Sequence, residues 1–142
     1  MSWDSYIDNL KTPDSNGVVA VAEAAICGML SGSESVWAST PALANISVEE
    51  IKRLAGKRSD FGQSGPLIGG VKCRMIRDNM DNDGMFSLDL KTAADASGNA
   101  FSVCVGKSKS ALVIAKGTKE ANGGQLASKV FGIVNYLRGV NM

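Results

Sequence analysis

Residues 71–115 read VKCRMIRDNMDNDGMFSLDLKTAADASGNAFSVCVGKSKSALVIA, and this stretch says most about the fold class. Runs rich in apolar and β-branched residues recur at short intervals, which predicts strands at residues 71–76, 85–91, 100–105 and 111–115. Turn-forming residues separate these runs at positions 82–84, 97–99 and 107–109. Because connections this short join antiparallel neighbours, we expect an antiparallel meander.

The second predicted strand alternates along its length. Phe86, Leu88 and Leu90 are apolar, and they alternate with Met85, Ser87, Asp89 and Lys91. Successive side chains of a strand point to opposite faces, so we expect the first set to pack inward and the second to present a surface that a partner can use.

Before the meander, a capping-box pattern marks a helix. Ser47 precedes Glu50 by three residues, and Ile46 can staple against Ile51, which predicts a helix to Leu54 that ends at Gly56. Residues 60–65 form a turn-rich connector after this helix.

Further upstream, residues 18–30 are mostly small and apolar. This composition suits a strand covered on both faces, and a helix is the alternative. Residues 35–39 predict a second short strand, which Thr40 and Pro41 close.

Both ends of the chain carry helical periodicity. Ser2 can cap a first helix, in which apolar residues recur at i, i+3, i+4 and i+7: Trp3, Tyr6, Ile7 and Leu10. After Gly123 and Gly124, a second apolar stripe extends toward the last residue: Leu126, Val130, Ile133, Val134 and Leu137. Helices that flank a run of strands indicate an α+β fold.

Composition limits the possible functions. The 142 residues suit a single domain, 1–142, and the formal net charge of +1 gives no global field that would attract a nucleic acid or a bilayer. The three cysteines, Cys27, Cys73 and Cys104, lack zinc or redox spacing, so we expect buried free thiols. We find neither a secretory signal nor an apolar run of membrane-spanning length, and we expect a reducing, cytoplasmic location.

The chain resembles the profilin family. The resemblance begins in the opening stretch at residues 3–10 and continues, in the family's order, through residues 35–38, 69–73, 76–78, 83–87 and 136–138. It implies a profilin-like central antiparallel sheet, with the N- and C-terminal helices packed side by side on one face and short helices on the other. It also implies a non-enzymatic, cytoskeletal adaptor that regulates actin filament assembly and needs no cofactor and no metal.

The resemblance implies a groove for proline-rich (poly-L-proline) peptides, formed by Trp3, Tyr6, Trp37, Tyr136 and Met142. By periodicity alone, the stripe on the first helix is a core face: Trp3, Tyr6, Ile7 and Leu10. Tyr136 lies about 60° to one side of Ile133 on the last helix, neither inward nor fully outward. Many animal profilins have histidine in place of Tyr136 and tyrosine in place of Met142, so Met142 offers apolar contact without a hydroxyl.

The resemblance also implies an actin-binding surface. Phe131 lies about 140° from Leu126 on the helix and cannot share a surface with Tyr136. By position, the family's actin contacts correspond to Met75, Arg77, Met85, Lys91, Ser102, Asn122, Gly124, Lys129 and Phe131. The alternative for each is ordinary: the charges are solvated and the methionines fill the core. Ala93, Ser128 and Gly132 stand where animal relatives often have charged groups, which predicts weaker or differently tuned actin binding.

Profilins commonly bind phosphoinositide headgroups at a membrane surface. Clustered cations are what such binding needs. The candidates in this chain are Lys72, Arg74, Lys91 and Arg138, and dispersed solubilising charge is the alternative.

An enzyme is the competing functional class. The sequence contains no histidine, which excludes histidine-activated nucleophiles and histidine–metal centres. Gly123 and Gly124 could hold a phosphate, yet a helix-entry turn explains them better. Asp81 and Asp83 suggest a calcium loop that lacks its distal carboxylate, so we interpret them as hairpin residues.

Overall fold

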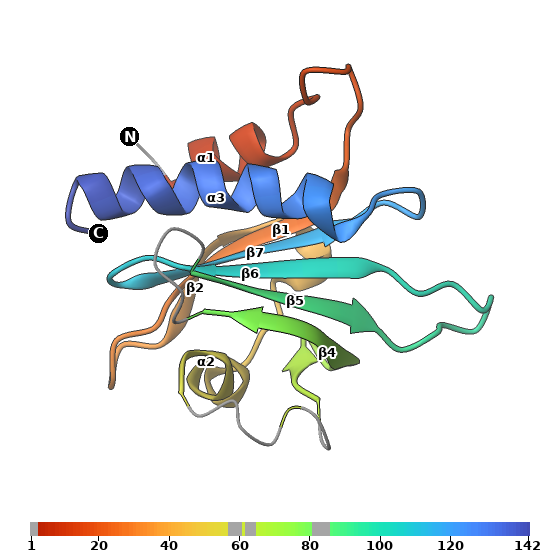
Figure 1. Ribbon diagram of the computed structural model, residues 1–142. Coiled ribbons are helices and arrows are strands. Elements are labelled where there is room, and N and C mark those ends of the chain that lie inside the picture. Colours follow the sequence, from red (N-terminus) through yellow and green to blue (C-terminus); the bar gives the residue numbers. More distant parts are fainter. Residues whose placement is uncertain (1–2, 57–60, 62–64, 81–85) are drawn as a thin grey trace.

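The computed structural model describes residues 3–56, 61, 65–80 and 86–142. Within them, seven strands form one antiparallel sheet in the order β2-β1-β7-β6-β5-β4-β3 (Figure 1). The strands are β1 (Val21–Gly28), β2 (Ser35–Ser39), β3 (Leu67–Ile68), β4 (Val71–Asn79), β5 (Ser87–Thr92), β6 (Ser102–Lys107) and β7 (Ala111–Gly117). The predicted meander corresponds to β4–β7 and is confirmed.

Helices cover both faces of the sheet. α1 (Trp3–Leu10) and α3 (Gly123–Gly139) lie side by side on one face, and α2 (Val48–Ala55) lies on the other (Figure 1). A short 3₁₀ helix, η1 (Pro41–Leu43), contacts β1. The α+β arrangement with the terminal helices on one face, which the resemblance implied, is confirmed.

The sheet separates two hydrophobic cores. Ile7 and Leu10 of α1 and the inward stripe of α3 belong to the first, which we call the terminal-helix core. Ile51 and Leu54 of α2 belong to the second, which we call the α2 core. Burial of apolar area in these two layers is the main force that holds the helices on the sheet.

Strand β1 lies between the two cores. Ala24 and Ile26 face the terminal-helix core, whereas Ala25 and Cys27 face the α2 core, and all four are fully buried. A strand with both faces covered needs small apolar residues on both sides. Residues 18–30 therefore contain a strand rather than the alternative helix.

The predicted capping box of α2 is present. Ser47 Oγ accepts a hydrogen bond from the Glu50 N–H at 3.2 Å, and Glu50 Oε1 accepts one from the Ser47 N–H at 2.9 Å. The Glu50 carboxylate also accepts from the N–H groups of Gly69 at 3.0 Å and Gly70 at 2.9 Å. Both glycines have left-handed backbones, with φ of 59° and 82°, so the capping box also fixes the β3–β4 turn.

Helix α3 begins with a second capping box, which the sequence analysis missed. The Asn122 side chain accepts from the Gln125 N–H, and the Gln125 side chain accepts from the Asn122 N–H, each at 2.9 Å. Further along, α3 packs closely on β6 at Gly106. A β-carbon added there would lie 2.4 Å from Val130 and 2.5 Å from Val134.

The expectation that Phe86 shares a face with Leu88 and Leu90 is wrong. Leu88 and Leu90 lie in the α2 core, whereas Phe86 packs against the terminal-helix core. Phe86 has a left-handed backbone, with φ of 49°, and precedes β5, so the alternation of the strand starts after it. The Ser2 cap, the turn at residues 82–84 and most of the connector at residues 60–65 lie outside the described residues.

All three cysteines are free and buried. Burial is the first cause that raises the pKa of the Cys27 thiol to about 12 and that of the Cys73 thiol to about 11. These thiols stay protonated at neutral pH and fill the core. Across the described residues, no helix has the length and apolar character needed to cross a bilayer.

Candidate interaction surfaces

Four aromatic rings line up across three elements. Ring centroids lie 4.7 Å apart for Trp37 and Trp3, 5.3 Å for Trp3 and Tyr6, and 6.2 Å for Tyr6 and Tyr136. β2 supplies Trp37, α1 supplies Trp3 and Tyr6, and α3 supplies Tyr136. We call this row the aromatic strip. Trp37 is 37% exposed and Tyr136 48% exposed, so the strip faces solvent rather than the core.

Local packing positions the rings. Ile7 and Leu10 are buried and hold α1 on the sheet, which leaves Trp3 and Tyr6 half-buried at its edge. Trp37 lies against Gly28 of the neighbouring strand, where an added β-carbon would come within 2.7 Å of its indole ring. Glycine at position 28 therefore lets the indole lie flat on β1.

The strip has polar groups as well as ring faces. Partial burial, the nearby Tyr136 phenol and a hydrogen bond with Tyr136 together raise the pKa of Tyr6 above its usual value. The Tyr6 hydroxyl is therefore protonated at neutral pH and can donate a hydrogen bond. Trp3 and Trp37 add indole N–H donors.

Met142, the fifth predicted peptide-binding residue, is tied to the β6–β7 turn. Its main-chain oxygen accepts hydrogen bonds from Ser108 Oγ at 2.8 Å and from Ser110 N and Oγ, each at 2.7 Å. Ser110 adjoins Ala111, which pairs with Gly28 beneath Trp37. Met142 therefore lies toward the Trp37 end of the strip.

A second surface spans β4, β5, β6 and the start of α3. It is a hollow of about 630 Å³ that contains five of the residues predicted to bind actin: Arg77, Lys91, Ser102, Asn122 and Gly124. We call it the β4–α3 surface. Its lining also includes Ile76, which is 53% exposed and lies in a β-bulge between Met75 and Arg77. Ile76 could not be predicted as part of this surface, because nothing in the sequence signals a bulge there.

Of the other four residues predicted to bind actin, the three that the structure describes do not line this hollow. Phe131 is 42% exposed and lies seven residues beyond Gly124 on the same flank of α3. Lys129 Nζ donates to Thr12 Oγ1 at 2.8 Å and to the Pro13 carbonyl at 3.4 Å. Met75 packs against the α2 core on the opposite face of the sheet, as in the core-filling alternative. Met85 lies outside the described residues.

Asp89 is a half-buried carboxylate on the β4–α3 surface. Its Oδ1 atom is buried and accepts no hydrogen bond within the described part of the chain. Burial raises the pKa of Asp89, although the neighbouring Cys104 thiol on β6 and the charge of Arg77 act in the opposite direction. Alternation with Lys91 in the sequence could have identified this residue.

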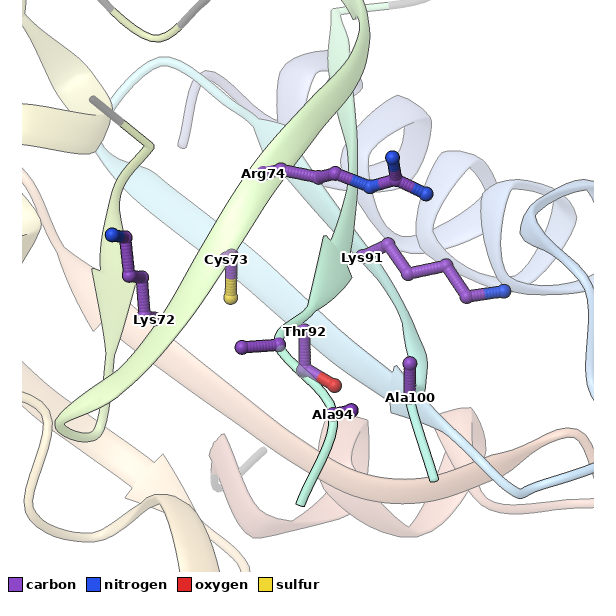
Figure 2. A pocket seen from close by; sticks show the side chains of 8 residues that line it. Lys72, Cys73, Arg74, Lys91, Thr92, Ala94 and Ala100 are labelled. Atoms are coloured by element: carbon purple, nitrogen blue, oxygen red, sulfur yellow. The ribbon is translucent and has the colours of Figure 1, made fainter. Parts of the chain in front are cut away.

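Three of the four predicted headgroup-binding cations gather at one hollow. Lys72, Arg74 and Lys91 line a space of about 400 Å³ beside Thr92, and Arg74 and Lys91 extend in the same direction while Lys72 points the other way (Figure 2). Arg74 and Lys91 are cross-strand partners, which explains their proximity.

The fourth cation, Arg138, lies elsewhere. Its guanidinium carbon is 3.3 Å from the centroid of the Phe86 ring, and its Nε and Nη2 donate to the Lys107 carbonyl at 3.0 and 2.8 Å. The structure therefore does not bring the four cations into one cluster. Within the described ranges, no three Cys, Asp or Glu side chains gather to hold a metal ion.

Comparisons with known proteins agree with one another. The family model for profilin matches residues 1–142. Human profilin-1 is 37% identical over 96% of this chain and 95% of its own length, and bovine profilin-2 is 33% identical over the same shares. A structure of mouse profilin IIa in complex with a double repeat from the FH1 domain of mDia1 superposes with a TM-score of 0.88, at 32% identity over 100% of both chains.

Proposed function

Because the chain belongs to the profilin family, we propose that residues 1–142 act as one adaptor domain that binds monomeric actin on one surface and proline-rich peptides on another. The observation that carries this proposal is the continuous aromatic strip, to which both ends of the chain contribute. The proposed activity is binding and not catalysis.

The strip suits a polyproline helix for two reasons. Proline rings stack on aromatic faces, and the backbone carbonyls of such a helix are free to accept hydrogen bonds from indole N–H and phenol O–H groups. Trp3 and Tyr6 offer one group of each kind, side by side. Mouse profilin IIa, at 32% identity, has been solved with an FH1 repeat bound, which supports the same use of the strip here.

Retention on immobilised poly-L-proline tests the peptide site. The wild type should be retained, and Trp3→Ala should abolish retention, because Trp3 contacts both neighbours in the strip. Phe131→Ala is the matched control: it removes an exposed aromatic ring outside the strip and should leave retention unchanged. Equal retention of wild type and Trp3→Ala would refute the proposed site.

The β4–α3 surface is the proposed actin site. It combines an exposed aliphatic group, Ile76, with cations at Arg77 and Lys91, and protein interfaces favour apolar centres and arginine. Phe131 extends this surface along α3. A titration of labelled monomeric actin should give saturable binding that weakens on Arg77→Glu, and an absence of binding by the wild type would contradict the proposal.

Phosphoinositide binding is a second candidate, favoured by the position of Arg74 next to Lys91 on an open hollow. Combined Arg74→Ala and Lys91→Ala substitutions should reduce co-sedimentation with vesicles that contain phosphatidylinositol bisphosphate. Arg138→Ala should change it little, because the Arg138 guanidinium is stacked on Phe86. Unchanged co-sedimentation of the double variant would remove this candidate.

In the proposed mechanism, the protein carries an actin monomer to growing filament ends, where proline-rich assembly factors hold the aromatic strip. A cytoplasmic location agrees with three free, buried thiols, which persist in a reducing compartment.

A further inference from the structure

The dipeptide Asn–Gly occurs twice in the chain, at residues 16–17 and 122–123. In such a pair the main-chain nitrogen of the glycine can attack the side-chain carbonyl carbon of the asparagine, because glycine has no β-carbon that obstructs the approach. The two pairs share this chemistry, but the structure holds them in different surroundings. The fold therefore decides how fast each of them reacts.

The reaction needs water and no other reactant. The glycine nitrogen forms a bond to the asparagine Cγ, and the side-chain amide leaves as ammonia, which takes up the proton of the glycine N–H. Water then adds across one C–N bond of the resulting succinimide ring. Opening at one carbonyl gives aspartate, and opening at the other gives isoaspartate, in which the main chain passes through the former side chain. Either product carries a new negative charge at neutral pH.

Asn16 and Gly17 lie at an exposed turn between α1 and β1. The Gly17 N–H donates to the Asp14 carbonyl at 3.0 Å. Asp14 Oδ1 accepts from the N–H groups of Asn16 at 2.8 Å and Val18 at 3.0 Å. Bonds of this kind at the surface open at little cost in free energy. Within the part of the chain that the structure describes, no hydrogen bond holds the Asn16 side chain, so its amide can turn toward the Gly17 nitrogen.

The turn itself requires a glycine after Asn16. Gly17 has a left-handed backbone, with φ of 77°, which residues with a β-carbon rarely adopt. A β-carbon built on Gly17 would meet no atom within 4 Å. The pair is therefore open to the water that the second step consumes.

Asn122 is held in the capping box of α3. Its Oδ1 accepts from the Gln125 N–H, and Gln125 Oε1 accepts from the Asn122 N–H, each at 2.9 Å. Closure of the succinimide ring would turn the Asn122 side chain toward the Gly123 nitrogen and break the first of these bonds. The helix would then lose its cap, which raises the barrier to the reaction at this pair.

We propose that Asn16 is a site of spontaneous modification, at which the chain converts to an acidic form with aspartate or isoaspartate, and that the capping box protects Asn122. The inference does not depend on the proposed function. The negative charge gained at residue 16 cancels the formal net charge of +1. The modified form should therefore associate and precipitate more readily than the unmodified one.

Incubation of the full chain at mildly alkaline pH and physiological temperature tests the inference. Peptide mapping by mass spectrometry distinguishes acid from amide at each position, and an isoaspartate-specific methyltransferase with labelled S-adenosylmethionine detects the rearranged product. Conversion at Asn16 should be about fivefold faster than at Asn122, or more, because Asn122 must first leave its cap. Isoelectric focusing should show an acidic species that appears at the same rate.

Incubation in concentrated urea separates the effect of the fold from that of the sequence. Unfolding removes both the turn and the capping box, so the two pairs should then convert at rates within about twofold of each other. Conversion at Asn16 that stays faster in urea by as much as in the folded chain would show that the flanking sequence, rather than the capping box, protects Asn122.

Two variants identify the source of the acidic species. Asn16→Gln should suppress it, because the longer side chain would have to close a larger ring. Asn122→Ser is the matched control: serine carries no amide and also caps helices, so the acidic species should form as in the wild type. Thermal unfolding checks that both variants are folded.

The inference would be overturned by an amide that persists at Asn16 while a short Asn–Gly peptide converts under the same conditions. Equal conversion of Asn16 and Asn122 in the folded chain would also overturn it. So would an acidic species that forms unchanged in Asn16→Gln.

Discussion

Among single residues, Glu50 joins helix α2 to the turn between β3 and β4. Its carboxylate accepts hydrogen bonds from Ser47, Gly69 and Gly70. Glu50→Ala should lower the free energy of unfolding by about 2–4 kcal/mol, because it removes a cap and leaves two turn N–H groups without their charged acceptor.

The neighbouring Glu49 provides the control, since it is exposed in the same first turn of α2. Glu49→Ala should change the free energy of unfolding by no more than about 0.5 kcal/mol in urea titrations. Equal effects of the two substitutions would show that Glu50 acts only through helix propensity.

Contacts between residues that are near one another in the sequence were the ones that could be predicted. Ser47 and Glu50 are three positions apart and match a known pattern, so their mutual hydrogen bonds could be foreseen. The contact from Glu50 to Gly69 spans 19 positions and depends on the path of the chain between them. Phe86 was misplaced because a single left-handed residue changes the face on which its side chain lies.

Among elements, the approach of α3 to β6 depends on Gly106. Gly106→Ala should lower the free energy of unfolding by about 1–3 kcal/mol, because the added methyl group would overlap Val130 and Val134. Gly132→Ala, in α3, should instead raise the free energy of unfolding by about 0.5–1 kcal/mol, because no atom lies within 4 Å of the added β-carbon. Thermal or urea unfolding of both variants measures the difference, and a neutral Gly106→Ala would mean that α3 shifts at little cost.

The helices and strands themselves could largely be predicted from the sequence, whereas the packing of one element against another could not. The apolar stripes predicted both terminal helices, and the capping box predicted the ends of α2 to within one residue. Periodicity cannot show that α1 and α3 lie side by side, because that depends on how each packs on the sheet; the family resemblance supplied it. The aromatic strip has the same origin: Tyr136 reaches Tyr6 only through this packing.

In the whole molecule, the two proposed binding surfaces lie on strands that are far apart in the sheet. Trp37 of the strip is on β2, whereas Lys91 of the β4–α3 surface is on β5, four strand positions away and so about 19 Å across the sheet. Both partners should therefore bind at once. Trp3→Ala should leave the affinity for labelled monomeric actin within about twofold of wild type, and Lys91→Glu should leave poly-L-proline retention intact.

Sedimentation of a mixture checks this expectation directly. The protein, monomeric actin and a proline-rich peptide should move as one ternary species. Displacement of actin by saturating peptide would contradict the separation of the two surfaces.

Gly28, the glycine beneath the Trp37 ring, has a consequence for sequence variation within the family. No proline-rich ligand needs to touch Gly28, yet any larger residue there would lift the indole from β1 and break the row of rings at its first member. Loss of peptide recognition could thus arise from a position hidden from every ligand. Comparisons of relatives that bind proline-rich peptides should therefore include the residue at position 28 as well as the aromatic residues of the strip.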